Sequence, residues 1–291
     1  MTTPIWIASR RMIWVALLLI ASGASAQDGG DGLEQARQTG TATLQVLWVA
    51  SPGWAERRSD GQINGVTIEL MRRFAQWLGE EHDLMVELEF VEEENWSHFY
   101  RRVRDARSGV FGLGNVTITE ARQTELQFSP PYARNTGVLI SSADVPELTR
   151  GESLPDLLHG RRAMAFADTL HEQRLRSLAE AYWPAMAMDF TGSNDEILAA
   201  VADGTHFAYI DGYHYLRAVQ SGAPLRRHPL FDDADERFGV IMPLSNDWSS
   251  LLERFFKTAD GGLLRSGWYQ DLLEQHLGQP TAHLMRLQPD N

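Results

Sequence analysis

Two residue types are nearly absent from this 291-residue chain: it has no cysteine, and Lys257 is its one lysine. Without cysteine there can be no disulfide framework, no thiolate zinc site, no iron–sulfur cluster and no cysteine nucleophile. We also expect no lipid tether, because attachment at a signal cleavage site requires cysteine. Positive charge is scarce as well, since 26 Lys and Arg face 39 Asp and Glu and give a net charge of −13. Nucleic acid is therefore not an expected partner, because phosphate binding requires a basic surface.

Catalytic and cofactor motifs are missing too. The sequence contains no Gly-x-Ser-x-Gly elbow, no Walker loop and no His-Glu-x-x-His. Residues 112–114 are only a fragment of a dinucleotide fingerprint, and Leu175 stands where a zinc motif beginning at His171-Glu172 would have its second histidine. We therefore predict no cofactor, no metal and no enzymatic activity.

The remaining polar groups have structural interpretations at this stage. His206 and His214, which flank the end of an expected strand, are interpreted as surface or capping residues. The acidic run at residues 92–94 is interpreted as a solvated loop and not as a catalytic pair.

The single long apolar run lies at the N-terminus. Arg10 and Arg11 precede nine apolar residues, and Ala-Ser-Ala26 follows, which is the pattern of a secretory signal peptide over residues 1–26. The run is shorter than the ~20 residues that span a bilayer. We expect cleavage after Ala26, a periplasmic protein with a net charge of −15, and no direct membrane insertion after cleavage. Residues 27–43 are rich in Gly, Asp and Gln, and we expect a loose leader there.

Strand and helix patterns alternate along the mature chain. Apolar residues recur at helical spacing over residues 67–78, 96–106, 172–182, 194–202, 248–258 and 268–277. Strand patterns occupy residues 43–49, 86–90, 110–113, 138–140, 163–167, 207–210 and 238–242. This alternation predicts an α/β protein with largely parallel sheets, and the length favours two lobes.

One segment breaks a local rule. Residues 114–123 follow a strand, and Thr119 is a natural N-cap for a short helix, with Glu120 in its first turn. Arg122 stands at the third helical position, near the positive end of the helix dipole, where a cation is unfavourable. A bound anion would offset this cost, and the Thr117 hydroxyl and free backbone N–H groups could join Arg122 in a carboxylate receptor. Alternatively, Arg122 pairs with a surface acid or points to solvent.

The run Asn115-Val-Thr-Ile-Thr-Glu-Ala-Arg122, followed by Phe128-Ser-Pro-Pro-Tyr132, resembles the signature of the family 3 extracellular solute-binding proteins. Residues 65–79, 160–169, 207–211, 238–243 and 263–278 resemble further segments of that family in the same order. The resemblance implies a type II periplasmic binding fold with two hinge crossings: lobe 1 at residues 44–134 and 236–291, and lobe 2 at residues 135–235. Ligand would lie between lobes that close by hinge motion.

The resemblance also implies the site residues. Arg122, with Thr117, would bind the ligand α-carboxylate, and Asp211 would accept its α-ammonium. Thr169 would donate to the carboxylate from the second lobe. From the sequence alone, the favoured interpretation of Asp211 is the N-cap of a helix that starts at Gly212, and the two roles can coexist. Trp54, Tyr132 and Tyr213 could line the cleft, and ordinary packing explains each of them as well.

Three departures from the family pattern bear on the ligand. Asn115 stands where the family often has a small residue, and Leu170 replaces a small polar residue. The loop at residues 49–54 has no acid, whereas family members that bind cationic amino acids have one there, which disfavours a Lys- or Arg-like ligand.

The leading hypothesis is a periplasmic solute-binding protein that delivers a polar amino acid or derivative to an ABC transporter permease. One alternative is an enzyme on the same scaffold, such as a cyclohexadienyl dehydratase-like lyase, although the sequence nominates no general acid. The other is a sensor that presents its ligand to a membrane-bound partner. A peptidoglycan-cleaving relative would carry an extra catalytic domain, for which we expect no room in this chain.

Overall fold

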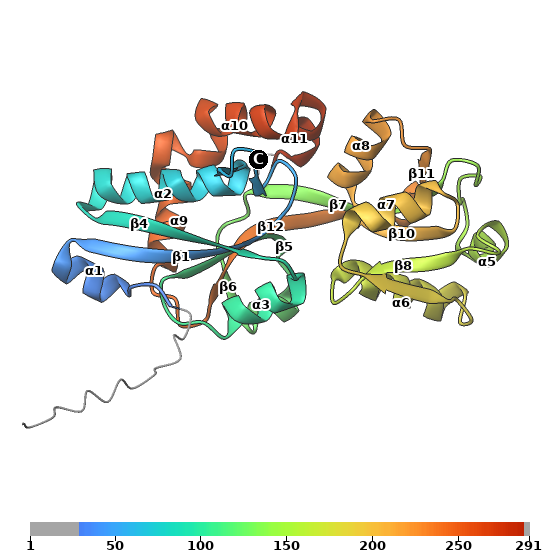
Figure 1. Cartoon of the computed structure of the whole chain (residues 1–291), viewed down its shortest axis with the longest axis horizontal. Coiled ribbons are helices and arrows are strands. Elements are labelled where there is room, and N and C mark those ends of the chain that lie inside the picture. The colour runs from blue at the N-terminus through green and yellow to red at the C-terminus, as the bar shows by residue number, and fades with distance from the viewer. Residues whose placement is uncertain (1–28, 288–291) are drawn as a thin grey trace, which may run out of the picture.

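The computed structural model describes residues 29–287, arranged as two α/β lobes side by side (Figure 1). The expected signal peptide lies outside the described residues. The first lobe contains strands β1 (Thr41–Val49), β4 (Met85–Glu93), β5 (Val110–Thr117) and β6 (Leu126–Phe128), a small hairpin of β2 (Glu56–Arg57) and β3 (Ile63–Asn64), and helices α1 (Leu33–Thr39), α2 (Val66–His82), α3 (Trp96–Arg104), α4 (Glu120–Gln123), α9 (Ser249–Thr258), α10 (Gly267–Leu277) and α11 (Gln279–Met285).

The second lobe lies between the two halves of the first in sequence. It contains strands β8 (Arg162–Phe166), β9 (Met188–Thr191), β10 (His206–Asp211) and β11 (Leu225–Arg227), and helices α5 (Leu154–Leu157), α6 (Leu170–Tyr182), α7 (Asn194–Ala202) and α8 (Gly212–Gln220). The long strands β7 (Ala133–Ser142) and β12 (Asp233–Pro243) run from one lobe into the other and pair antiparallel. They join the lobes through one continuous sheet with the order β4-β1-β5-β12-β7-β10-β8-β9.

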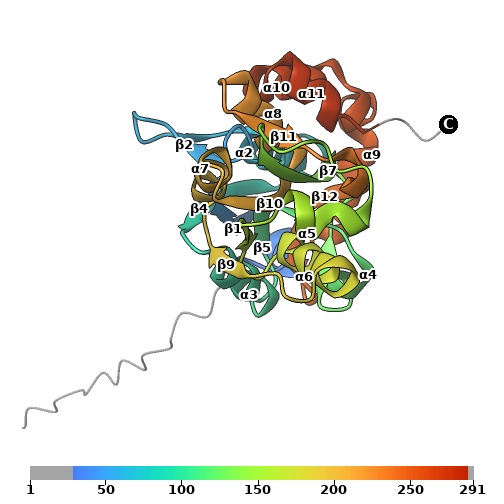
Figure 2. The ribbon, with the colours of Figure 1, turned by 90° about the vertical axis from the view of Figure 1, so that its right-hand side faces the viewer.

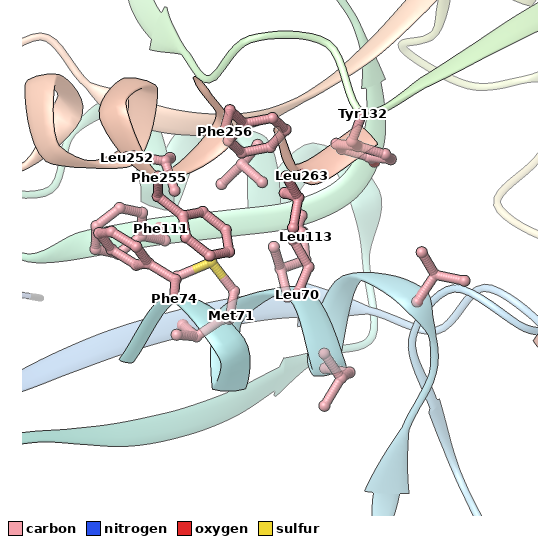
Figure 3. Close-up of a cluster of buried hydrophobic side chains, with 14 of the residues drawn as sticks. Leu70, Met71, Phe74, Phe111, Leu113, Tyr132, Leu252, Phe255, Phe256 and Leu263 are labelled. Carbon is pink, nitrogen blue, oxygen red and sulfur yellow. The ribbon is translucent and has the colours of Figure 1, made fainter. Parts of the chain in front are cut away.

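Helices cover both faces of the sheet in the first lobe. The larger core packs α2, α9 and α10 against one face, and Figure 3 shows its centre, where Phe74 of α2 meets Phe111 of β5 and Phe255 of α9. A smaller cluster around Phe99 of α3 fills the opposite face. Because residues at helical spacing on α2 are fully buried here, the expected apolar stripe of this helix is confirmed.

The second lobe is built in the same way. Seen from its end, β10 lies between α6 on one side and α7 with α8 on the other (Figure 2). Leu175 of α6 belongs to one core cluster, and Ile197 and Val201 of α7 belong to the other. The rigid packing on both faces fixes the ends of β8 and β10, which carry the polar residues described below.

Residues 33–43 differ from the expected loose leader. Leu33 and Ala36 of α1 are buried in the larger core, and β1 begins at Thr41. Asp247 accepts a hydrogen bond from the Leu33 backbone N–H at 2.8 Å, and the backbone carbonyl of Asp31 accepts one from the Trp248 indole at 2.8 Å. The composition of this segment concealed a short amphipathic helix, because only two of its apolar side chains have to reach the core.

Across residues 29–287, none of the helices combines the length and the apolar composition that a bilayer crossing requires.

Candidate functional site

A cavity of about 480 Å³ lies between the lobes, and both lobes contribute to its wall. The first lobe supplies residues after β1, β4 and β5, and the second supplies residues after β8, β9 and β10. Ligand sites in open α/β sheets form at these carboxyl ends of strands. The cavity wall includes Arg122, Thr117, Asn115, Thr169 and Asp211, so the structure brings these predicted site residues together.

Arg122 is held by contacts that leave it without a carboxylate partner. The Thr119 side chain accepts the Arg122 backbone N–H at 3.2 Å, as an N-cap, and the guanidinium donates from Nη1 to the Thr117 carbonyl at 2.9 Å. The guanidinium also lies 5.5 Å from the Trp96 ring centre and 5.7 Å from that of Tyr100. Burial lowers the pKa of Arg122, which is the signature of a cation removed from water.

The carboxylates near Arg122 are engaged elsewhere. Glu125 pairs with Arg104, and Glu236 pairs with Arg174. Within residues 29–287, no ion pair includes Arg122. A desolvated guanidinium that faces a cavity without a counter-ion favours an anionic group on whatever enters. The alternatives of a surface ion pair and of a solvated side chain therefore do not describe Arg122.

Asp211 ends β10 on the opposite wall of the cavity. It occupies the N-cap position of α8, but its side chain makes no capping hydrogen bond. Instead, Oδ1 accepts a hydrogen bond from Asn135 Nδ2 at 2.6 Å and lies 3.2 Å from His171 Nε2. Burial opposes ionisation most strongly, but His171, His214 and Asn135 together lower the pKa of Asp211. Asp211 is thus an anionic group on the lobe that faces Arg122.

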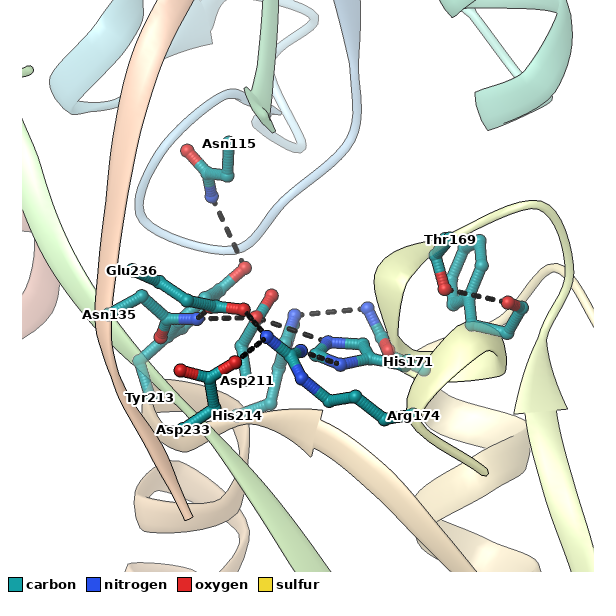
Figure 4. A network of polar contacts seen from close by, with 12 residues as sticks. Asn115, Asn135, Thr169, His171, Arg174, Asp211, Tyr213, His214, Asp233 and Glu236 are labelled. Atoms are coloured by element: carbon teal, nitrogen blue, oxygen red, sulfur yellow. Dashed lines mark hydrogen bonds and ion pairs between the residues drawn. The ribbon is translucent and has the colours of Figure 1, made fainter. Parts of the chain in front are cut away.

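Asp211 belongs to a closed ring of side chains at the crossing strands (Figure 4). Asn135 of β7 donates from one amide nitrogen to both Asp211 and Glu236, and Glu236 of β12 pairs with Arg174 of α6. Arg174 Nη1 lies 3.0 Å from His171 Nδ1, and His171 Nε2 returns to Asp211. Because an arginine can only donate, His171 Nδ1 accepts and Nε2 carries the hydrogen that faces Asp211.

The ring joins both crossing strands to the Asp211 carboxylate at the cavity wall. Arg174 also binds Asp233 of β12 at 2.7 Å. A side chain at Gly137 of β7 would collide with the Arg174 guanidinium, since its Cβ would lie 2.7 Å from Nη1. The hinge region and Asp211 are therefore one connected polar unit, which sequence spacing did not predict.

Two further predicted residues lie behind the cavity wall. Trp54 and Tyr132 are each 1% exposed and do not line the cavity. The Tyr132 hydroxyl donates to Asn115 Oδ1 at 2.9 Å, and Asn115 Nδ2 donates to Ser51 at 3.1 Å and to Tyr213 at 3.2 Å. Tyr132 therefore orients Asn115, whose backbone is left-handed with φ of 50°, a conformation that asparagine tolerates better than most residues.

Thr169 lies at the start of α6 and lines the cavity. Its hydroxyl donates to the Phe166 carbonyl at 2.7 Å, so its oxygen can still accept a hydrogen bond from a ligand. Figure 4 shows Thr169 on the second-lobe wall and Asn115 on the first-lobe side.

Two interpretations from the sequence are wrong. Glu93 is 7% exposed and contacts Arg102 and His98, so it is part of the buried cavity wall and not of a solvated loop. His214 is also buried in the wall, where burial lowers its pKa to about 4. Asn194 Nδ2 lies 3.0 Å from His214 Nε2 and donates to it. Neither position stands out in sequence, because its burial depends on the tertiary packing of its own lobe.

No group of three or more His, Cys, Asp or Glu side chains within residues 29–287 is arranged to hold a metal ion. The arrangement instead places the Arg122 guanidinium and the Asp211 carboxylate on opposite walls of the cavity.

Two lobes joined by two strands, with a charged cavity between them, define a type II periplasmic binding fold. The chain belongs to the bacterial extracellular solute-binding proteins, family 3, whose sequence model matches residues 49–279.

Solved structures share this fold at low sequence identity. A chain from the study of glutathione import via GshT and the cystine ABC importer TcyBC of Streptococcus mutans has a TM-score of 0.66 and 16% identity, over 85% of this chain and 97% of that one. The arginine-, lysine-, histidine-binding protein ArtJ from Geobacillus stearothermophilus has a TM-score of 0.63 and 17% identity, over 81% and 96%. These likenesses establish the fold.

Curated relatives are longer proteins. The membrane-bound lytic murein transglycosylase F of Saccharophagus degradans is 24% identical over 74% of this chain and 41% of its own length. The membrane-bound lytic murein transglycosylase F of Pseudomonas fluorescens is 26% identical over 59% of this chain and 32% of its own length. The chain therefore spans well under half of the curated relatives that it matches.

Proposed function

We propose that this protein is a non-enzymatic receptor that captures a small zwitterionic solute, a polar amino acid or a derivative of one, between its lobes. The observation that carries the proposal is Arg122, a partly buried cation that faces the cavity without an ion-pair partner in the described part of the chain. Asp211 on the other lobe supplies the opposite charge. A ligand with both charges would bridge the lobes and favour their closure.

We further infer that the receptor is periplasmic after removal of residues 1–26, and that it delivers its solute to an ABC importer. Membership in the solute-binding family supports this role. The two bodies that close would be residues 44–134 with 236–291, extended by the packed residues 29–43, and residues 135–235. Their motion would occur at β7 and β12, the two strands that cross between lobes.

Thermal unfolding with a panel of the twenty L-amino acids tests capture. A ligand at 100 times its Kd stabilises the folded protein by about 2.7 kcal/mol, which raises the melting temperature by roughly 5–10 °C for a chain of this size. Arg122→Ala should remove this shift, whereas Arg237→Ala, an exposed arginine outside the cavity, should retain it. An unchanged shift in Arg122→Ala would contradict the carboxylate assignment.

One observation bears on the enzyme alternative, which needs a buried carboxyl group. Glu93 is such a group in the cavity wall. Both of its oxygens are already engaged, by Arg102 and by His98 at 2.6 Å, whereas a general acid must present a proton to the substrate. These contacts support a structural role for Glu93. Turnover of prephenate or arogenate by the purified protein would revive the enzyme alternative.

A further inference from the structure

The cavity carries more negative charge than a simple zwitterion needs. Three of its carboxylates have cations of their own: Glu92 pairs with Arg57 at 2.6 Å, Glu93 with Arg102, and Glu236 with Arg174. Arg122 and Asp211 are the groups assigned to the two ends of the ligand. Glu94 and Asp195 remain, and neither forms an ion pair within residues 29–287.

These two acids come from opposite lobes. Glu94 directly follows β4, whereas Asp195 lies in the first turn of α7, where the helix N-terminus favours a negative charge. Both side chains are exposed to solvent at the cavity wall. Both acids therefore face the same space between the lobes.

The sheet register explains why the sequence did not reveal the first of these acids. β1 and β4 run parallel, and Val49 pairs with Glu93. The segment after β4 therefore lies beside the segment after β1, which has no acid over residues 49–54. Glu94 supplies negative charge next to the place where the sequence alone indicated none.

The imidazoles in the wall are already engaged by neighbouring side chains. His171 accepts a hydrogen bond from Arg174 on Nδ1, and His214 accepts one from Asn194 on Nε2. A ring nitrogen that accepts a hydrogen bond has no hydrogen to offer a ligand, and burial lowers the pKa of His214 to about 4. A bound zwitterion whose α-ammonium is its single cationic group would leave Glu94 and Asp195 without counter-charge.

The volume of the cavity permits a longer ligand. At about 480 Å³ the cavity has room for far more than the few atoms of an α-carboxylate and an α-ammonium. We propose that the ligand is an amino acid or short derivative with a cationic side chain, and that Glu94 and Asp195 bind this second positive charge from opposite lobes. This inference rests on the proposed capture of a zwitterion.

Calorimetric titration with two matched pairs tests this specificity. L-Arginine and L-citrulline have nearly the same shape and differ in side-chain charge. L-Lysine and L-norleucine have side chains of similar length and likewise differ in charge. We expect the charged member of each pair to bind roughly tenfold more tightly, the effect of two partly exposed ion pairs. The preference should weaken in 0.5 M salt, because exposed charges are screened.

The variant Glu94→Gln/Asp195→Asn should lose this preference and bind L-citrulline with unchanged affinity. The matched control Glu180→Gln/Asp203→Asn changes two exposed acids outside the cavity and should behave as the wild type. Equal binding of both members by the wild type, or a preference that survives in Glu94→Gln/Asp195→Asn, would overturn the proposal. If neutral amino acids bind in an Arg122-dependent way without this preference, only the specificity fails. If no amino acid binds, the proposed function fails with it.

Discussion

Replacement of Asn135 by leucine tests the polar ring at the hinge, because one side-chain amide holds two carboxylates. Asn135 is 2% exposed, and its Nδ2 donates to Asp211 at 2.6 Å and to Glu236. Leucine is similar in volume and donates nothing. The buried Glu236 and the partly buried Asp211 would each lose a charge-assisted hydrogen bond, which is worth about 1.5–3 kcal/mol.

The expected net loss is smaller than the sum of these two bonds. Arg174 and His171 remain to stabilise Glu236 and Asp211. The carbonyl oxygen of Asn135 is buried without a partner, so its removal recovers about 1 kcal/mol. We therefore expect Asn135→Leu to lower the free energy of unfolding by about 2–4 kcal/mol.

Urea unfolding measures this change. With a slope of about 1–3 kcal/mol per molar urea, the midpoint should fall by roughly 1 M or more. Gln220→Leu, which removes an exposed amide at the end of α8, is the matched control and should leave the midpoint unchanged. Amino acid affinity should also fall more than about tenfold in Asn135→Leu, because Asp211 loses the donor that orients it. An unaltered midpoint together with unaltered affinity would refute the role of the ring.

Two further predictions concern stability. His228 and His214 are buried, and burial lowers the pKa of each to about 4. The histidines of the unfolded chain take up protons below about pH 6.5, whereas these two stay unprotonated in the folded protein until about pH 4. The free energy of unfolding should therefore fall between pH 6.5 and 4 by at most about 1.4 kcal/mol per pH unit for each histidine. Urea titrations at several pH values check this, and a flat profile over that window would contradict it. Gly65 has φ of 125°, and a Cβ there would lie 2.3 Å from the Trp54 carbonyl oxygen, whereas Gly61 has φ of 82° and open space around it. Calorimetry should find Gly61→Ala destabilised by about 1–2 kcal/mol from backbone strain and Gly65→Ala by more than about 3 kcal/mol, so equal losses would argue against this packing.

Local patterns sufficed for much of the fold and for part of the site. The apolar spacing in α2, α3 and α7 reflects a buried face that each helix has by itself, and the predicted helices are confirmed. Thr119 and Arg122 could be singled out because capping and dipole rules act within one turn. These signals are readable because their causes lie within a few residues.

Contacts between distant segments could not be predicted in this way. Glu93 reaches the cavity wall only through the parallel pairing of β4 with β1. Asn135 and Arg174 lie on different elements, and the polar ring closes only when β7, β10, α6 and β12 are assembled. Trp54 could not be assigned to core or cleft from sequence, since a buried aromatic ring fits either; the structure places it in the core, 5.7 Å from Tyr132 between ring centres.

The central claim, that Arg122 binds a ligand carboxylate, is tested most directly by combining a change in the protein with a change in the ligand. Affinities of wild type and Arg122→Gln would be measured for the amino acid that binds and for its carboxamide. The wild type should prefer the acid by roughly 10–100-fold, as expected for charge-assisted hydrogen bonds, and Arg122→Gln should bind acid and amide nearly equally. If Arg122→Gln keeps the full preference for the acid, the carboxylate binds elsewhere and the account is wrong.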